Sequence, residues 1–115
     1  MPQHLGEFEQ LVLFAVLRLG DEAYGVQIRQ EIEARTDRPV SAGAIYTTLG
    51  RLETRGYVAS SVGDTVPARG GRRRKYYRLL ADGASALERA YSHVQDMASG
   101  VLDELALQAK GGDEE

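Results

Sequence analysis

The chain has 115 residues, of which 43% are hydrophobic, 14 basic and 17 acidic, giving a net charge of −3. This size and composition predict one folded domain with a modest core and argue against general disorder. The absence of cysteine excludes disulfides, zinc–thiolate sites and cysteine nucleophiles, and without a signal or membrane-span pattern we expect a cytoplasmic protein with no membrane partner.

The first predicted element is a helix from Leu5 to Leu19. Its middle is apolar almost all the way round, so neighbours must cover it on two sides. Those neighbours are either the core of its own domain alone, or that core and a partner subunit. The residues at helical spacing are Phe8, Leu11, Val12, Ala15, Val16 and Leu19.

A turn at residues 20–22 leads to a second helix, from Ala23 or Tyr24 to Arg35. Its end is predicted by the segment 36–39, because Asp favours turns and the residue before a proline leaves the helical region. Residues 36–40 are expected to be irregular. Two short helices joined in this way are typical of a helix-turn-helix, although plain helical bundles contain similar pairs.

The third helix is predicted from the segment 41–56. Ser41 is placed to cap its start and Gly56 to end it, and Val40 with Ile45 fits a hydrophobic staple. At 100° per residue Ile45, Leu49 and Leu52 fall on one stripe, which can face a core. The opposite side is nearly flat and can enter a DNA major groove or simply face solvent: Gly43, Ala44, Thr47, Arg51 and Thr54.

After Gly56 the hydrophobic period changes from 3.6 to 2. Residues 57–62 and 74–80 therefore predict an antiparallel hairpin, with residues 63–73 as a mobile tip. Residues 69–78 hold six cations and no acid, which leaves 8 basic and 17 acidic residues, a balance of −9, in the rest of the chain. A polar loop is the usual reason for a charge run, but following a helix-turn-helix it indicates a DNA-binding wing.

A long last helix is predicted over residues 82–110, capped by Asp82, and residues 111–115 are expected to be a disordered acidic tail. Its apolar stripe is longer than a winged-helix body needs, so it either packs against a second copy of the chain or folds back on its own domain. We therefore expect an α+β, mainly α, winged helix-turn-helix at residues 1–81 followed by a C-terminal dimerisation helix.

With these segments placed, the sequence resembles the PadR family of transcriptional regulators in its short form with a single C-terminal dimerisation helix. The resemblance covers roughly residues 5–108. It is carried by Tyr24-Gly25, by residues 40–46, 49–53 and 55–56, by the run 70–79 and by Asp82-Gly83.

The resemblance implies a homodimeric regulator of double-stranded DNA, usually a repressor at a palindromic operator. It implies that one set of residues enters the major groove: Ser41, Gly43, Ala44, Thr47, Thr48 and Arg51. Tyr24 and Tyr46 border the groove and reach phosphates, and the wing cations are Arg69, Arg72, Arg73, Arg74 and Lys75. The dimer interface is predicted to contain Phe8, Leu11, Val12, Leu87, Tyr91, Val94, Ala98, Val101, Leu102 and Leu105.

The sequence departs from many family members at the base-facing positions, including Ala42, Ala44, Thr47 and Gly50, so the operator cannot be carried over. Some members respond to small aromatic effectors, for which Tyr91, His93 and Met97 are candidate lining residues; core packing is their other use. His4 and His93 stand alone, without metal-ligand spacing, so we expect no enzyme, metal or cofactor. The alternative function is a helical protein–protein adaptor with a basic hairpin.

Overall fold

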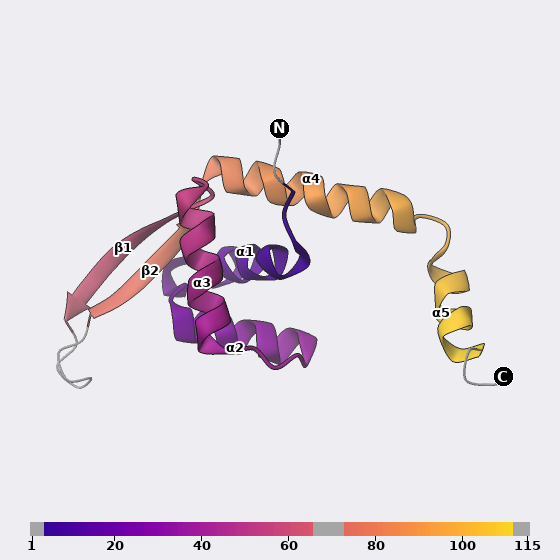
Figure 1. Cartoon of the computed structure of the whole chain (residues 1–115), viewed down its shortest axis with the longest axis horizontal. Helices are drawn as coiled ribbons and strands as arrows, with labels where there is room; N and C mark the ends of the chain where they lie inside the picture. Colours follow the sequence, from indigo (N-terminus) through magenta and orange to yellow (C-terminus); the bar gives the residue numbers. More distant parts are fainter. Residues whose placement is uncertain (1–3, 66–72, 112–115) are drawn as a thin grey trace.

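The computed structural model describes residues 4–65 and 73–111. Figure 1 shows α1, α2 and α3 gathered at the centre, a hairpin projecting to one side, and α4 running past them. This arrangement confirms the expected mainly helical winged helix-turn-helix. The elements in chain order are α1 (Glu7–Leu19), the short 3-10 helix η1 (Gly20–Glu22), α2 (Gly25–Thr36), α3 (Ala42–Thr54), β1 (Val58–Thr65), β2 (Arg73–Leu79), α4 (Ala81–Ala98) and α5 (Leu102–Gly111).

The helix α1 lies at the centre of the core, because its apolar middle is contacted by α2, α3, α4 and β2. Val12 and Leu13 are completely buried, and Leu17 on the remaining side is exposed. The core of its own domain, common to both expected arrangements, is therefore confirmed and covers most of the helix, while a partner subunit on the remaining side stays a prediction. The other elements of the domain also contribute to this core, and their members of it include Ile28, Ile32, Ile45, Leu49, Leu52, Val58, Tyr77 and Leu87.

The turn between α2 and α3 is fixed by two hydrogen bonds to one residue of α2. The Asp37 N–H donates to the Glu33 carbonyl at 3.0 Å, and Asp37 has a left-handed φ of 55°. The Val40 N–H donates to the Glu33 carboxylate at 3.0 Å. The predicted break between the two helices is therefore confirmed, but it begins at Asp37, because Thr36 is the last residue of α2. Glu33 sets the path from one helix to the next.

Both predicted ends of α3 are confirmed. The Ala44 N–H donates to the Ser41 hydroxyl at 3.0 Å, which is an N-cap. At the other end the Tyr57 N–H donates to the Leu52 carbonyl at 2.9 Å and the Gly56 N–H to the Glu53 carbonyl at 3.0 Å. Together with a φ of 79° at Gly56, this pair forms a Schellman motif.

Removing the cap of α3 should weaken the domain measurably. Ser41→Ala leaves the Ala44 N–H without its side-chain acceptor, so we expect a loss of about 1 kcal/mol in the free energy of unfolding. For a domain of this size this corresponds to a Tm lower by roughly 3–6 °C. Ser41→Asp, which keeps an acceptor at the cap, is the control in a thermal melt followed by circular dichroism. Equal melting of wild type and Ser41→Ala would contradict a stabilising cap.

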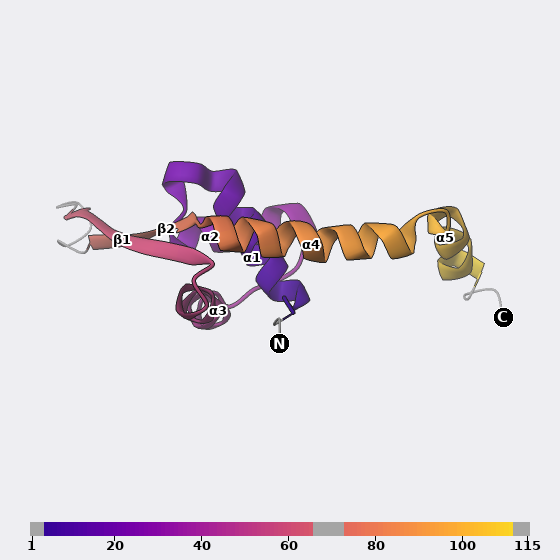
Figure 2. The same ribbon diagram turned by 90° about the horizontal axis from the view of Figure 1, so that it is seen from above.

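The two strands pair antiparallel, from Val58 opposite Leu79 to Thr65 opposite Arg73, with an irregularity between Val62 and Thr65. The segment before α2 adds a third partner to this hairpin. The Tyr77 N–H donates to the Ala23 carbonyl at 2.8 Å, and Tyr24 forms a bridge with Tyr76. The base of the wing is thereby attached to the start of α2, and Figure 2 shows the hairpin extending away from that base.

The C-terminal region differs from the prediction, because the single helix expected over residues 82–110 is two helices. Gly100 has a φ of 83°, which a continuous helix does not allow, and Ser99 is extended. Glycine adopts this conformation at little cost, so it permits the break. Asp82 is also not the cap: Leu80 occupies that position, and Asp82 lies in the first turn of α4. Gly111, expected in the tail, ends α5; residues 112–115 lie outside the described residues.

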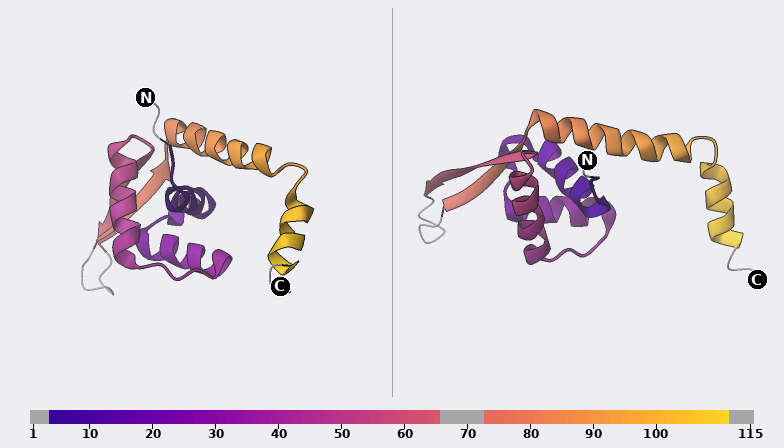
Figure 3. Two further views of the ribbon diagram at one scale, coloured as in Figure 1. Left: turned by 45° about the vertical axis from the view of Figure 1, so that its right-hand side comes forward. Right: turned by 45° about the horizontal axis from the view of Figure 1, so that its top comes forward.

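The molecule is elongated rather than compact. Its radius of gyration is 17.2 Å and its extents are 58 × 35 × 20 Å, whereas a compact chain of this length has a radius of gyration of about 13 Å. The hairpin projects from the central helices at one end of the molecule and the second half of α4 at the other (Figure 1). The helix α5 stands apart from the domain in both views of Figure 3. Among the described helices, none is both long and apolar enough to span a membrane.

Candidate nucleic-acid interface

The exposed side of α3 carries most of the residues predicted to enter the major groove. Ile45, Leu49 and Leu52 are completely buried and hold the helix to the core. Over its first two turns the opposite side has small side chains apart from Tyr46 at its border, and one long cation follows. The predicted residues that lie exposed there, or at the cap that precedes it, are Ser41, Gly43, Ala44, Tyr46, Thr47 and Arg51.

The prediction for Thr48 is wrong. Its side chain is only 5% exposed, because Thr48 follows Ile45 by three residues and precedes Leu52 by four, which places it on the same stripe. A side chain buried there cannot reach a base edge while the domain is folded. The groove-facing set on α3 therefore excludes Thr48.

Tyr46 lies across the gap between α3 and α2. A Cβ atom built on Gly25 would come within 2.2 Å of the Tyr46 hydroxyl oxygen, so the phenol rests directly on the first residue of α2. About half of the Tyr46 side chain remains exposed. The ring is thus held at the border of the α3 face, with its hydroxyl at the start of α2.

Tyr24 and Arg74 form one cluster at the base of the wing. The Arg74 guanidinium lies 4.1 Å from the centroid of the Tyr24 ring, and the Tyr24 and Tyr76 rings meet edge to face at 5.5 Å. Gln27 donates to the Tyr24 hydroxyl at 3.1 Å. A hydrogen bond with Tyr76 raises the pKa of Arg74. The stacking holds this cation beside α2, where a phosphate can reach it.

Lys75 points toward the end of α3. Its ammonium lies 3.9 Å from the Glu53 carboxylate, which also accepts a hydrogen bond of 2.5 Å from the Ser60 hydroxyl. Lys75 is exposed, and an exposed pair of this length is weak, so a phosphate can compete for it. Arg69 and Arg72 lie outside the described residues, as does the side chain of Arg73.

Sequence reasoning missed Arg55, which joins the end of α3 to the start of α1. Its guanidinium lies 3.2 Å from the Glu9 carboxylate, and the two side chains are only 16% and 14% exposed. The same guanidinium lies 4.9 Å from the centroid of the Tyr57 ring. This largely buried contact of Arg55 thus fixes the orientation of α3 relative to α1. Its position directly before Gly56 carried no signal for a partner 46 residues away.

The residues predicted for a dimer interface divide into three groups. Val12 and Leu87 are buried in the core of a single chain, so the prediction for these two is wrong: they have no surface to offer a partner. Phe8, Leu11 and Ala98 are partly buried, the first two against the core. The exposed group is Tyr91, Val94, Val101, Leu102 and Leu105.

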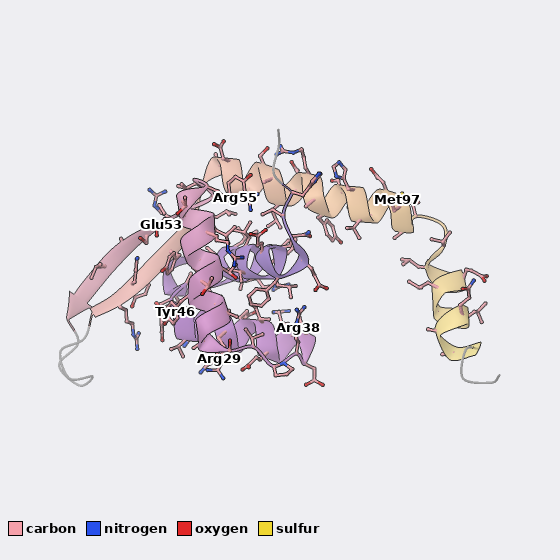
Figure 4. The ribbon with its side chains drawn as sticks, viewed as in Figure 1. Arg29, Arg38, Tyr46, Glu53, Arg55 and Met97 are labelled. Atoms are coloured by element: carbon pink, nitrogen blue, oxygen red, sulfur yellow. The ribbon has the colours of Figure 1, made fainter. Side chains whose placement is uncertain are left out.

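Two further apolar side chains, Met97 and Leu107, are exposed in the same region. Met97 is 82% exposed, and Figure 4 places it near the end of α4, away from the domain. We refer to these two residues and the five exposed residues named above, all between Tyr91 and Leu107, as the C-terminal apolar stripe. Exposed apolar surface of this extent is typical of an interaction site.

An open pocket with a volume of about 280 Å³ lies between α1 and α4. The residues that line it are Phe14, Leu17, Leu79, Ala84, Leu87, Glu88 and Tyr91. The rings of Phe14 and Tyr91 meet edge to face at 5.9 Å. Of the three residues suggested for an effector pocket, only Tyr91 lines this surface; His93 and Met97 are exposed elsewhere on α4. No group of three or more metal-binding side chains gathers within residues 4–65 and 73–111.

Comparison with known proteins agrees with this geometry. The model of the transcriptional regulator PadR-like family matches residues 13–89. A PadR family transcriptional regulator from Eggerthella lenta is 28% identical, with a TM-score of 0.65, covering 86% of each chain. A PadR family regulator from Clostridium difficile is 24% identical, with a TM-score of 0.69, covering 85% of this chain and 98% of that one. None of the curated proteins compared matches the chain.

Proposed function

The chain belongs to the transcriptional regulator PadR-like family, and on that premise we propose that it acts as a homodimeric repressor at a palindromic operator. DNA-binding transcriptional regulation is the activity of this family, and the fold of this chain is the same. Beyond this family activity we propose four points for this chain: which residues contact DNA, that it forms a dimer, that its operator is palindromic, and that it represses transcription.

The observation that carries the proposal is the exposed side of α3. It is smooth at Gly43, Ala44 and Thr47, which lets the helix backbone approach base edges, and Arg51 extends from its second half. An arginine in the major groove can donate two hydrogen bonds to guanine, the commonest base-specific contact. Around this side we expect four residues to contact the phosphates that flank the groove: Tyr24, Tyr46, Arg74 and Lys75.

A homodimer is supported by the C-terminal apolar stripe. Leu102 and Leu105 are each more than 60% exposed in the single chain, so covering them removes apolar surface from water. A second copy supplies the same stripe, and two-fold pairing of identical surfaces is the commonest way in which such a face is covered. Two α3 helices related by a two-fold axis would read a palindrome.

Repression and effector response complete the proposal. A dimer held on its operator excludes other proteins from the same DNA, which is the simplest way for it to lower transcription. The apolar surface beside Phe14, Leu17 and Tyr91 suits a small aromatic molecule, whose ring could stack at the edge of Tyr91. Because Tyr91 also belongs to the apolar stripe, a molecule bound there would alter the packing of the dimer and hence the spacing of the two α3 helices.

Arg51→Ala tests base reading by α3. On an operator first selected from random duplexes with the wild-type protein, the variant should lose about 1–3 kcal/mol of binding free energy, and much less on random duplex, because only the operator presents the matching base. The measurement is fluorescence anisotropy on both duplexes, with Arg35→Ala as a control of equal charge change on α2. Equal losses on both DNAs would remove Arg51 from base reading.

The same titration repeated at several salt concentrations separates DNA binding from the adaptor alternative. Each neutralised phosphate releases condensed counterions, so affinity for duplex should fall steeply and log-linearly as salt rises. Weak association that does not change with salt would favour the adaptor.

A further inference from the structure

A groove between α2 and α3 was not part of the predicted interface. It has a volume of about 290 Å³ and opens beside the exposed side of α3. Arg29 and Tyr46 belong to its lining, and in Figure 4 both are found toward the same end of α3. The residues that line it are Gly25, Val26, Arg29, Gln30, Glu33, Ala42 and Tyr46.

One wall of this groove is the Tyr46 phenol. Because the hydroxyl oxygen would lie only 2.2 Å from a Cβ atom on Gly25, only glycine leaves room for the ring in this position. The ring is therefore held against the first turn of α2, and its hydroxyl is a donor available at the edge of the groove.

Arg29, whose side chain is 45% exposed, also lines the groove. Its Nε lies 3.6 Å from the Oε2 atom of Glu33, the same oxygen that accepts the Val40 N–H at 3.0 Å. Glu33 is thus anchored to the turn and holds Arg29 in place by an ion pair through Nε. Among the described residues Arg29 has no second ion-pair partner, so its two Nη groups can face an incoming anion.

The Arg29–Glu33 pair can be exchanged for a contact with DNA. It is exposed and longer than a good hydrogen bond, and pairs of this kind contribute little to stability. A phosphate offers a full negative charge and oxygens that match the guanidinium fork, which gives a stronger, charge-assisted contact. Glu33 remains held by the Val40 N–H after the exchange.

We propose that this groove binds one backbone phosphate of the DNA, between the Arg29 guanidinium and the Tyr46 hydroxyl. The inference rests on the proposed entry of α3 into the major groove. When α3 lies in the major groove, the sugar–phosphate backbone of one DNA strand passes beside it, and α2 crosses that backbone. Arg29 then adds one counterion-releasing contact per subunit to those of the wing.

Arg29→Ala, Arg29→Lys and Arg35→Ala test this site. Arg35 is a matched control, because it lies on the same helix, is paired i,i+4 with Glu31, and is about 120° round the helix from Arg29. Affinity for a mixed-sequence duplex is measured by fluorescence anisotropy between about 50 and 200 mM salt. Thermal melts of all variants confirm that each is folded.

For Arg29→Ala we expect affinity to fall on the order of tenfold on every duplex, and the log–log salt slope to become shallower by about 0.9 per subunit. Arg29→Lys keeps the charge and should retain the slope, with a smaller loss of affinity. Arg35→Ala should match wild type.

Two results would overturn the inference while wild type binds duplex normally: an unchanged slope in Arg29→Ala, or an equal change of slope in Arg35→Ala. A wild-type protein that fails to bind duplex at all would instead overturn the proposed function on which the inference rests.

Discussion

Gly83→Ala should destabilise the domain by about 3 kcal/mol, which corresponds to a Tm lower by roughly 10–15 °C. Gly83 is buried in the first turn of α4, where a Cβ atom would lie 2.2 Å from the carbonyl oxygen of Tyr57 and 2.9 Å from its carbonyl carbon. These are backbone atoms, and the same oxygen accepts the Leu80 N–H at 2.9 Å. The clash can be relieved only by moving α4 away from the end of α3.

The higher helix propensity of alanine stabilises the variant and so opposes the clash at Gly83. A control must therefore measure the effect of helix propensity alone. Alanine is better than glycine inside a helix by about 1 kcal/mol, which the clash at Gly83 must exceed. Gly50, in the middle of α3, has open space where its Cβ would stand. Gly50→Ala should therefore raise stability by roughly 0.5–1 kcal/mol. The measurement is chemical denaturation at one fixed protein concentration. If Gly83→Ala were as stable as Gly50→Ala, α4 would not pack on Tyr57 as described.

Leu102→Asp is expected to split the proposed dimer and to lower operator affinity at least about a hundredfold, because two linked half-site contacts become independent. Leu102 is 62% exposed in the single chain, so an aspartate there is hydrated in the monomer and leaves the winged domain folded. In the dimer the same charge would be buried without a partner, which is strongly unfavourable.

The control for this prediction is Gln108→Asp, which adds the same charge to α5 about 120° round the helix from Leu102. Light scattering reports the mass of each variant, and anisotropy on the operator reports its affinity. A Leu102→Asp variant that remains dimeric would place α5 outside the interface. A monomer that binds the operator as tightly as wild type would argue against two half-sites.

The winged helix-turn-helix was predictable because its signals are local. Ser41 caps α3 through a hydroxyl three residues from its donor, and Gly56 ends that helix in the conformation that glycine favours. The change of period after Gly56 marks the hairpin in the same way. These features depend on residues within one or two turns of each other, so the sequence displays them directly.

The errors arose where a residue satisfies two patterns at once. Thr48 is polar enough for the groove-facing set, yet it sits between Ile45 and Leu52 on the buried stripe. Val12 and Leu87 fit an interface as well as a core, and the core contains them. Periodicity shows that a position faces something apolar, but it does not show whether that surface belongs to the same chain.

The sequence alone determined the order and type of the elements up to β2, the ends of α3 and the apolar character of the C-terminal region, since each follows from neighbours along the chain. Only the tertiary structure decided that Arg74 stacks on Tyr24, that Arg55 pairs with Glu9, and that Tyr46 closes a groove beside Arg29. It also decided that the last helix breaks at Gly100. The side-chain contacts could not be predicted because they depend on distances between elements that are far apart in the sequence. The break could not be predicted because a glycine that a helix would tolerate can equally adopt a positive φ.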